Sequence, residues 1–202
     1  ATVGHLYLDA YHATGDEQFY EATKSATDAL VRGQHPAGGW NYVIDTAGEE
    51  ALKRWYATYG KNAWRLEEFQ HYYGNATFDD AGTAEASQLL LRVYLEKRER
   101  QYRAPLDKAI QFVLDAQYAN GGWPQRYPFV QNGGVHGHTD YTPYITFNDD
   151  VAGENLEFLL YAYQGLAVNG RGDARLLDAI HRGMDIYVKT QQPMPQPAWG
   201  LQ

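Results

Sequence analysis

Hydrophobic positions along the chain repeat in a way that predicts two kinds of helix. In residues 89–95 and 156–163, apolar side chains occupy most of a helical circumference, which is typical of a helix buried on all sides. In residues 106–114 they form a narrower stripe with polar residues between them, which indicates a helix at the surface. The chain therefore alternates between inner and outer helices.

This pair of helices occurs in three similar units, at residues 2–40, 83–123 and 151–200. Each unit contains a helix, a short polar turn, a second helix and a loop with a tryptophan, and such self-similarity indicates a repeat architecture. Inner and outer helices that alternate around a ring form an α/α toroid. We therefore expect an all-α fold, in which residues 1–202 form a single partial α/α toroid, an incomplete barrel of helix hairpins with long irregular loops at one rim.

A glutamine precedes the tryptophan in the first two units, Gln34 before Trp40 and Gln117 before Trp123. We expect these glutamines to cap a helix end and to stack on the tryptophan that begins the return loop. For Trp123, a place in this scaffold and a place in a binding site are equally compatible with the sequence.

Two long connections lie outside the helix pairs, at residues 41–78 and 124–147. Connections of this length inside a compact domain are usually functional. The first carries the basic residues Lys53, Arg54, Lys61 and Arg65 with aromatic neighbours, and the second has Arg126 among aromatic residues near its start. Acidic, basic and aromatic groups close together favour a site for a polar, anionic ligand.

Each long connection ends in acidic residues at the start of an inner helix, in the segments TFDD (77–80) and TFNDD (146–150). Because the units repeat, both segments are expected at one end of the ring. Helix capping alone would need one oxygen at each helix start. Four buried carboxylates without a counter-charge would raise one another's pKa, so a bound cation or a cluster of arginines is expected beside them. Oxygen ligands without cysteine favour calcium over zinc.

Composition narrows the possible functions further. The net charge of −8 argues against general binding to nucleic acid or to an anionic membrane, and no apolar run approaches the ~20 residues of a membrane span. The absence of cysteine excludes disulfides and zinc–sulfur sites. The 17 tyrosines and 5 tryptophans offer flat surfaces that suit both sugars and helix packing. His136 and His138, which flank Gly137 in a long polar loop, are more typical of solvent-facing groups than of a metal pair.

Three motifs together resemble a known family. NGGWPQRYP at 120–128, ITFNDD at 145–150 and ATFDDAGTAE at 76–85 are similar to the family 10 polysaccharide lyases, pectate lyases with an α/α toroid catalytic domain. The resemblance covers most of the chain from Gly39 onward. It implies β-elimination of de-esterified homogalacturonan with the help of calcium. In that reaction, calcium and basic side chains neutralise the uronate carboxylate, so that the neighbouring C5 proton can be removed.

The resemblance also assigns residues. It implies that Asp79 and Asp149 are catalytic and that Asp79, Asp80 and Asp149 surround the metal, with Asp80 in place of an asparagine. Substrate contacts are expected from basic and aromatic side chains, with Arg126 on the uronate carboxylate: Arg126, Trp123, Tyr127, Lys61 and Arg65. The family's base arginine is expected after the third tryptophan loop, beyond Gln202.

Two other kinds of protein remain compatible with the residues. A glycoside hydrolase on the same type of toroid could use Glu154 or Glu157 with an aspartate as acid and base. A non-catalytic carbohydrate-binding module is the other alternative. In the lyase interpretation we expect a secreted or periplasmic monomer that acts on polygalacturonate and binds neither nucleic acid nor membranes.

Overall fold

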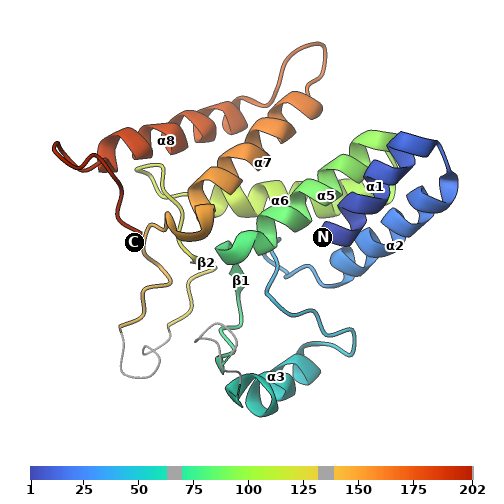
Figure 1. The fold of residues 1–202 in the computed structure, drawn as a ribbon, viewed down its shortest axis with the longest axis horizontal. Helices are drawn as coiled ribbons and strands as arrows, with labels where there is room; N and C mark the ends of the chain where they lie inside the picture. Colours follow the sequence, from blue (N-terminus) through green and yellow to red (C-terminus); the bar gives the residue numbers. More distant parts are fainter. Residues whose placement is uncertain (63–69, 132–138, 202) are drawn as a thin grey trace.

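The computed structural model describes residues 1–62, 70–131 and 139–201. Three pairs of consecutive helices form its main body (Figure 1). Their bounds are Thr2–Thr14 (α1), Glu17–Arg32 (α2), Gly82–Lys97 (α5), Arg103–Ala116 (α6), Val151–Gly165 (α7) and Ala174–Thr190 (α8). The expected all-α fold is therefore confirmed, and the three pairs follow the three sequence units. Among the described helices, none has the length and apolar character needed to cross a membrane.

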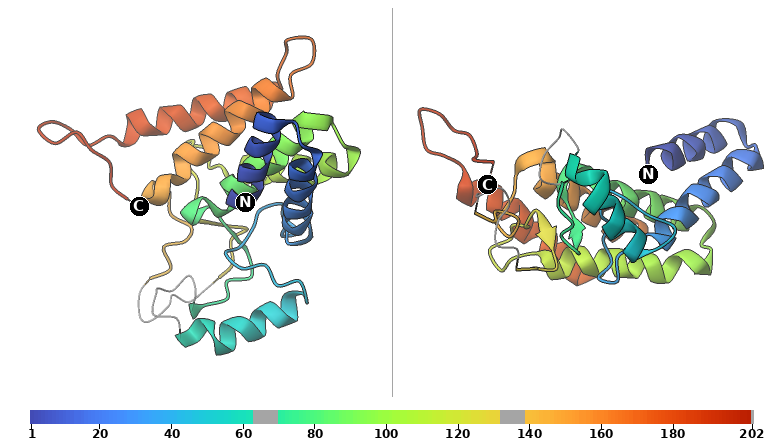
Figure 2. Two further views of the ribbon diagram at one scale, coloured as in Figure 1. Left: turned by 45° about the vertical axis from the view of Figure 1, so that its right-hand side comes forward. Right: turned by 90° about the horizontal axis from the view of Figure 1, so that it is seen from below.

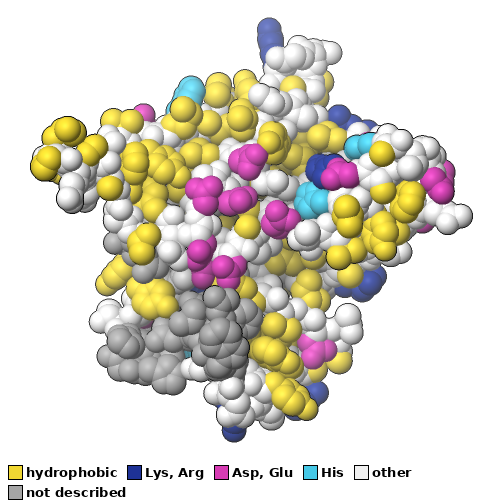
Figure 3. Space-filling model, viewed as in Figure 1, with side chains coloured by type: hydrophobic (Ala, Val, Ile, Leu, Met, Phe, Trp, Pro, Cys, Tyr) yellow, Lys and Arg dark blue, Asp and Glu magenta, His cyan; other side chains and the backbone are white. Residues whose placement is uncertain are grey.

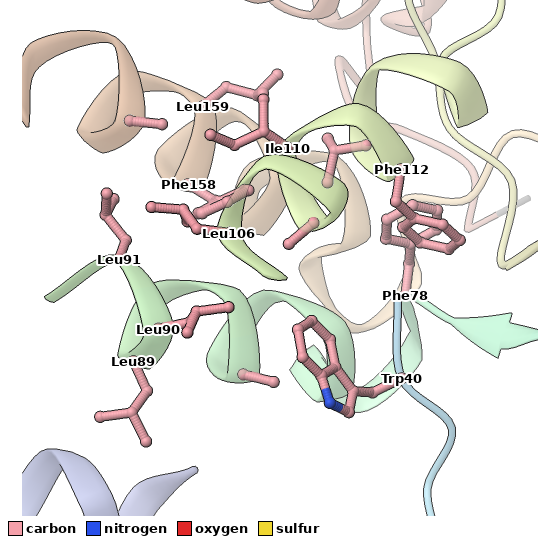
Figure 4. Close-up of a cluster of buried hydrophobic side chains, with 14 of the residues drawn as sticks. Trp40, Phe78, Leu89, Leu90, Leu91, Leu106, Ile110, Phe112, Phe158 and Leu159 are labelled. Atoms are coloured by element: carbon pink, nitrogen blue, oxygen red, sulfur yellow. The ribbon is translucent and has the colours of Figure 1, made fainter. Parts of the chain in front are cut away.

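The inner helices α5 and α7 lie at the centre of the molecule. Helix α5 contacts α1, α2, α6 and α7, and it buries Leu89, Leu90 and Leu91. In Figure 4, Leu90 and Leu91 face side chains of α6 and α7, whereas Leu89 points toward the first helix pair, where its side chain lies against Gly4 of α1, so one core joins the three helix pairs. Helix α7 differs from the prediction, because Leu160 and Tyr161 are exposed. The face of α7 that carries them is not covered by the described part of the chain.

The remaining described elements belong to the connections between these helices. They are α3 (Glu49–Thr58), η1 (Gly60–Asn62), β1 (Ala76–Thr77), η2 (Asp79–Ala81), η3 (Arg100–Tyr102), β2 (Arg126–Tyr127) and η4 (Asn148–Asp150). Strands β1 and β2 pair antiparallel, with Thr77 opposite Arg126. The ladder therefore joins the two long connections, and α3 lies on the same side of the molecule, apart from the helix pairs (Figures 1 and 2).

The glutamines of the first two units bind carbonyl groups. Gln34 Nε2 donates to the carbonyl of Gly38 at 2.7 Å and to that of Pro105, in α6, at 3.0 Å. Gln117 Nε2 repeats this toward Gly121 at 3.0 Å and Ala179, in α8, at 2.9 Å. Each glutamine therefore ties its own loop to the next outer helix, which fixes the spacing between units.

A candidate site at two acidic turns

The turns η2 and η4 lie side by side. Their Cα atoms approach within 8 Å of one another, and η2 also contacts α7. Each turn leads directly into an inner helix, η2 into α5 and η4 into α7, and these helix starts meet near the centre of Figure 1. Acidic side chains gather over this part of the surface in Figure 3. The prediction that the two acidic helix starts lie together at one end is therefore confirmed.

Both turns have the same unusual backbone. Two consecutive residues in each turn have positive φ: Asp80 (50°) and Ala81 (55°) in η2, and Asp149 (48°) and Asp150 (55°) in η4. The left-handed conformation costs non-glycine residues roughly 1–2 kcal/mol each, although aspartate tolerates it better than most. Strain of this kind gathers at functional sites, and here it recurs at equivalent positions. The repeated backbone makes Asp79 equivalent to Asn148 and Asp80 equivalent to Asp149.

In the first turn, Asp79 is enclosed by the protein. Its side chain is only 4% exposed, and Oδ2 accepts hydrogen bonds from the Tyr42 hydroxyl at 2.5 Å and from Gln125 Nε2 at 3.0 Å. Burial, together with the Asp79 carboxylate, raises the pKa of Tyr42 and keeps its hydroxyl protonated. The other oxygen, Oδ1, is shielded from solvent and accepts no hydrogen bond. A buried acceptor in that state costs free energy, so Oδ1 is suited to a further donor or a cation.

Arg126 is also enclosed, with an exposed fraction of 1%. Its guanidinium carbon lies 4.2 Å from the centre of the Tyr73 ring and 5.3 Å from that of Tyr42, and Nη1 donates to Asn75 Oδ1 at 3.2 Å. The remaining Nε and Nη2 groups have no hydrogen-bond partner. Because a polysaccharide cannot reach a side chain buried to this degree, we reassign Arg126 from binding uronate to supporting the site.

The other residues expected to bind substrate differ in their surroundings. Trp123 is fully buried and donates from Nε1 to the Val113 carbonyl at 2.9 Å, so it belongs to the scaffold. Tyr127 is half-buried and lies edge-on to Phe112 and Phe129. Lys61 is exposed in η1, next to α3. Arg65 lies outside the described residues, as do His136 and His138.

In the second turn the acidic side chains are open to solvent. Asp149 and Asp150 are exposed, and Asn148 Nδ2 donates to Asp149 Oδ2. Asp80 of the first turn is exposed as well. Both turns thus present an exposed aspartate at equivalent positions.

Glu154 follows the second turn on α7, where Gln88 Nε2 of α5 approaches its Oε2 at 3.4 Å. Burial raises the pKa of Glu154, and the negative charges of Glu157, Asp150 and Glu85 add to this effect. Glu85 occupies the equivalent position on α5, at 3.8 Å from His5. The starts of both inner helices are therefore rich in carboxylates.

The side chains of the two turns carry the oxygen donors that a hard cation prefers, but in the structure these donors do not surround a common point. Within residues 1–62, 70–131 and 139–201, no three acidic or imidazole groups already surround one point. The aspartates of both turns nevertheless offer only oxygen donors, which calcium prefers, and the Oδ1 atom of Asp79 lacks a partner. Ligation would require the exposed Asp80 and Asp149 side chains to turn toward Asp79.

Tyr42, Tyr73 and Asn75 are the part of this site that the sequence analysis missed. None of them lies in a periodic pattern or in an acidic motif, so no local signal distinguishes them from other polar and aromatic residues of the first connection. Gln125 carried a weak signal, because it stands in the segment NGGWPQRYP on which the family resemblance rests.

Comparison with solved structures agrees with the fold. A family 10 polysaccharide lyase from Cellvibrio cellulosa has a similar structure, with a TM-score of 0.57 and 24% sequence identity over 83% of this chain and 46% of that one. An Asp-to-Ala variant of that lyase in complex with trigalacturonic acid gives the same values. At this identity the likeness shows a shared fold, and the chain spans less than half the length of those structures.

The sequence comparison reaches further than the fold. No match is found among curated proteins. A family model described as pectic acid lyase, however, matches residues 49–202, which include both acidic turns and α5 to α8. The resemblance to family 10 polysaccharide lyases is thereby confirmed, and the chain belongs to the pectic acid lyase family.

Proposed function

We propose that this chain carries the cation-binding and substrate-binding part of a pectate lyase that cleaves de-esterified homogalacturonan by calcium-assisted β-elimination. The proposal is carried by one observation, the contact between two strained acidic turns from neighbouring units on an exposed face. Membership of the pectic acid lyase family supports it. An enzyme with this substrate is expected to act outside the cytoplasm, as a monomer.

The chemistry explains why such a site needs clustered carboxylates. The C5 proton of a uronate is weakly acidic because its removal builds negative charge beside an existing carboxylate. Calcium, when bound, supplies positive charge that stabilises this developing charge. Asp80 and Asp149 would hold the cation from the two exposed turns, and Asp79 would add its Oδ1 atom from the enclosed side.

The reaction ends with an unsaturated sugar. Removal of the C5 proton leaves an electron pair that forms the C4–C5 double bond, while the C4–O bond breaks and the oxygen leaves with the other part of the chain. In this proposal the aspartates position the cation and the sugar acid. Proton removal is assigned to the arginine that the family pattern puts after the third tryptophan loop.

One observation favours a hydrolase as a second candidate. The raised pKa of Glu154 and the proximity of Glu157 are what a general acid beside a second carboxylate would show. A hydrolase would release saturated sugars, whereas the lyase forms the unsaturated, ultraviolet-absorbing product. The two reactions can therefore be separated by their products alone.

The decisive experiment measures both products on polygalacturonate, with and without a calcium chelator, using the longest natural form of the protein. We expect an ultraviolet rise that the chelator abolishes and added calcium restores. Asp149→Asn should lower this activity at least tenfold, as expected for a ligand of a catalytic cation. Asp185→Asn, at an exposed position on α8, serves as the control and should leave the activity unchanged. Saturated sugars without the ultraviolet rise would replace the lyase by a hydrolase, and binding of trigalacturonate without either product would indicate a binding module.

A further inference from the structure

Two donors from different connections meet on one oxygen of Asp79. Tyr42 lies 37 residues before Asp79 and Gln125 lies 46 residues after it, and both donate to Oδ2. The backbone N–H of Asp79 donates in turn to Thr77 Oγ1 at 3.1 Å. Two donors on one oxygen fix the plane of the carboxylate, so the direction of the Oδ1 atom is fixed as well.

The chemical nature of these donors matters. A hydroxyl and an amide stabilise the carboxylate without cancelling its negative charge, whereas an arginine or lysine in their place would neutralise it. Arg126 is the buried cation nearby, yet within the described part of the chain no carboxylate lies within ion-pair distance of it. Its charge rests instead over the rings of Tyr73 and Tyr42. In the described part of the chain, the Asp79 carboxylate therefore has no lysine or arginine within ion-pair distance.

Arg126 also holds the ring that carries the hydroxyl. Arg126 stands on β2 and pairs with Thr77 of β1, and Thr77 lies two residues before Asp79. The guanidinium of Arg126 lies over the Tyr42 ring. Cation–π contacts of this kind are stronger when they are shielded from water. The strand pair, the guanidinium and the Tyr42 ring thus form one rigid support behind the carboxylate.

We propose that Tyr42 is a positioning residue of the cation site, whose hydroxyl acts with the Gln125 amide to hold Oδ2 of Asp79 and so present Oδ1 to the cation. This inference rests on the proposed function, because it concerns the same site. Groups that orient a metal ligand from behind commonly change metal affinity 10- to 100-fold when they are removed. Tyr42 is thereby given a role that is distinct from any contact with the sugar.

The test compares calcium binding by wild-type protein, Tyr42→Phe and Tyr56→Phe in isothermal titration with calcium chloride. Tyr42→Phe removes the hydroxyl and keeps the ring under Arg126, and we expect its Kd for calcium to rise roughly 10- to 100-fold. Tyr56→Phe is the matched control, because the Tyr56 ring is also buried but its hydroxyl has no hydrogen-bond partner. Its Kd should equal that of the wild type. Equal Kd values for wild type and Tyr42→Phe would overturn the inference, as would an equal loss in both variants.

A second variant and a kinetic readout separate positioning from a merely structural role. Gln125→Leu removes the other donor and should weaken calcium binding in the same direction, which keeps the inference testable if Tyr42→Phe fails to fold. Excess calcium should restore the cleavage rate of Tyr42→Phe to that of the wild type, whereas damage to the fold would persist at any calcium concentration. A rate that stays low under saturating calcium contradicts positioning.

The inference and the proposed function can fail separately. If the wild type binds calcium and Tyr42→Phe weakens that binding, but no unsaturated product forms, the lyase proposal fails and the positioning role stands. If the wild type forms the unsaturated product but binds no calcium, the positioning role is overturned and the elimination stands.

Discussion

The two acidic turns share a backbone and differ in what surrounds it. In η2, Asp79 is enclosed and two residues from distant connections hold its carboxylate. In η4, the equivalent Asn148 donates to its neighbour Asp149 within the turn, and the aspartates are exposed. The same backbone conformation therefore gives one turn whose carboxylate is enclosed and held, and one turn whose carboxylates are exposed. For a site that has to bind both a cation and a long polymer, the fixed side can orient the cation while the open side admits the sugar.

The reason for the difference lies in the neighbouring loops. The N–H of Phe78 donates to the Gln125 carbonyl, and the N–H of Phe147 donates to the Leu201 carbonyl in the corresponding way. Trp123 behind the first turn is fully buried, whereas Trp199 behind the second is 42% exposed. One backbone link thus recurs with different packing around it, and the packing decides how tightly each turn is held.

The largest expected effect concerns a feature common to the repeated units, the glycine that stands two residues before the tryptophan in each of the first two units. Gly38 and Gly121 have φ of 117° and 105°, and a Cβ at either position would overlap the backbone carbonyl of Lys108 or Arg182. We expect Gly38→Ala and Gly121→Ala each to lower the free energy of unfolding by about 3 kcal/mol or more, measured by urea denaturation. Gly15→Ala is the control, since Gly15 also has positive φ but faces open space, and should lose about 1 kcal/mol. Equal losses at all three positions would show that backbone strain, and not packing between units, dominates.

A smaller effect should separate the turns from each other. Asp79→Ala removes the oxygen that accepts from both the Tyr42 hydroxyl and the buried Gln125 amide, so we expect a loss of about 2–3 kcal/mol in the free energy of unfolding without calcium. Asn148→Ala, at the equivalent and less buried position, should lose less than about 1 kcal/mol. Urea denaturation of both variants in chelator gives the comparison. Similar losses would mean that the two turns are held equally, contrary to their hydrogen bonds.

The smallest effect concerns pH and the inner helix behind each turn. The pKa of Glu154 is raised in the folded state, so the folded protein holds this proton more tightly than the unfolded chain does. The free energy of unfolding should therefore fall as pH rises from about 4.5, the ordinary value for glutamate, through the folded pKa. Glu154→Gln removes this loss and should gain less than about 1 kcal/mol at neutral pH, because the side chain is partly solvated. At pH values below about 4.5, this gain in the free energy of unfolding should vanish.

Glu85→Gln is the matched control for this measurement. Glu85 is equivalent to Glu154 in the repeat but lies beside His5, so its replacement should bring no gain at neutral pH. Thermal or urea unfolding at several pH values, in calcium-free buffer, checks both variants. A gain for Glu85→Gln as large as that for Glu154→Gln would show that general repulsion among acidic groups, and not the surroundings of Glu154, is responsible.

The periodic part of the fold could be predicted from the sequence because its cause is local. Leu89, Leu90 and Leu91 fall on a helix that is apolar around most of its circumference, and that property depends only on neighbouring residues. The repeat then placed the two acidic segments at equivalent positions, so their proximity followed. Leu160 and Tyr161 show where this reasoning stops, because apolar residues were expected inside and the structure leaves them exposed.

The sequence by itself determined the alternation of helices, the acidic helix starts and the family, since each depends on spacing or on short motifs. Only the tertiary structure decided that Arg126 and Trp123 are buried, that Asp79 is held on one oxygen, and that Tyr42 is the residue that holds it. Composition makes these residues capable of such contacts but does not choose among them. The choice is made when the two long connections pair through β1 and β2, because that pairing brings together side chains tens of residues apart and excludes water from them.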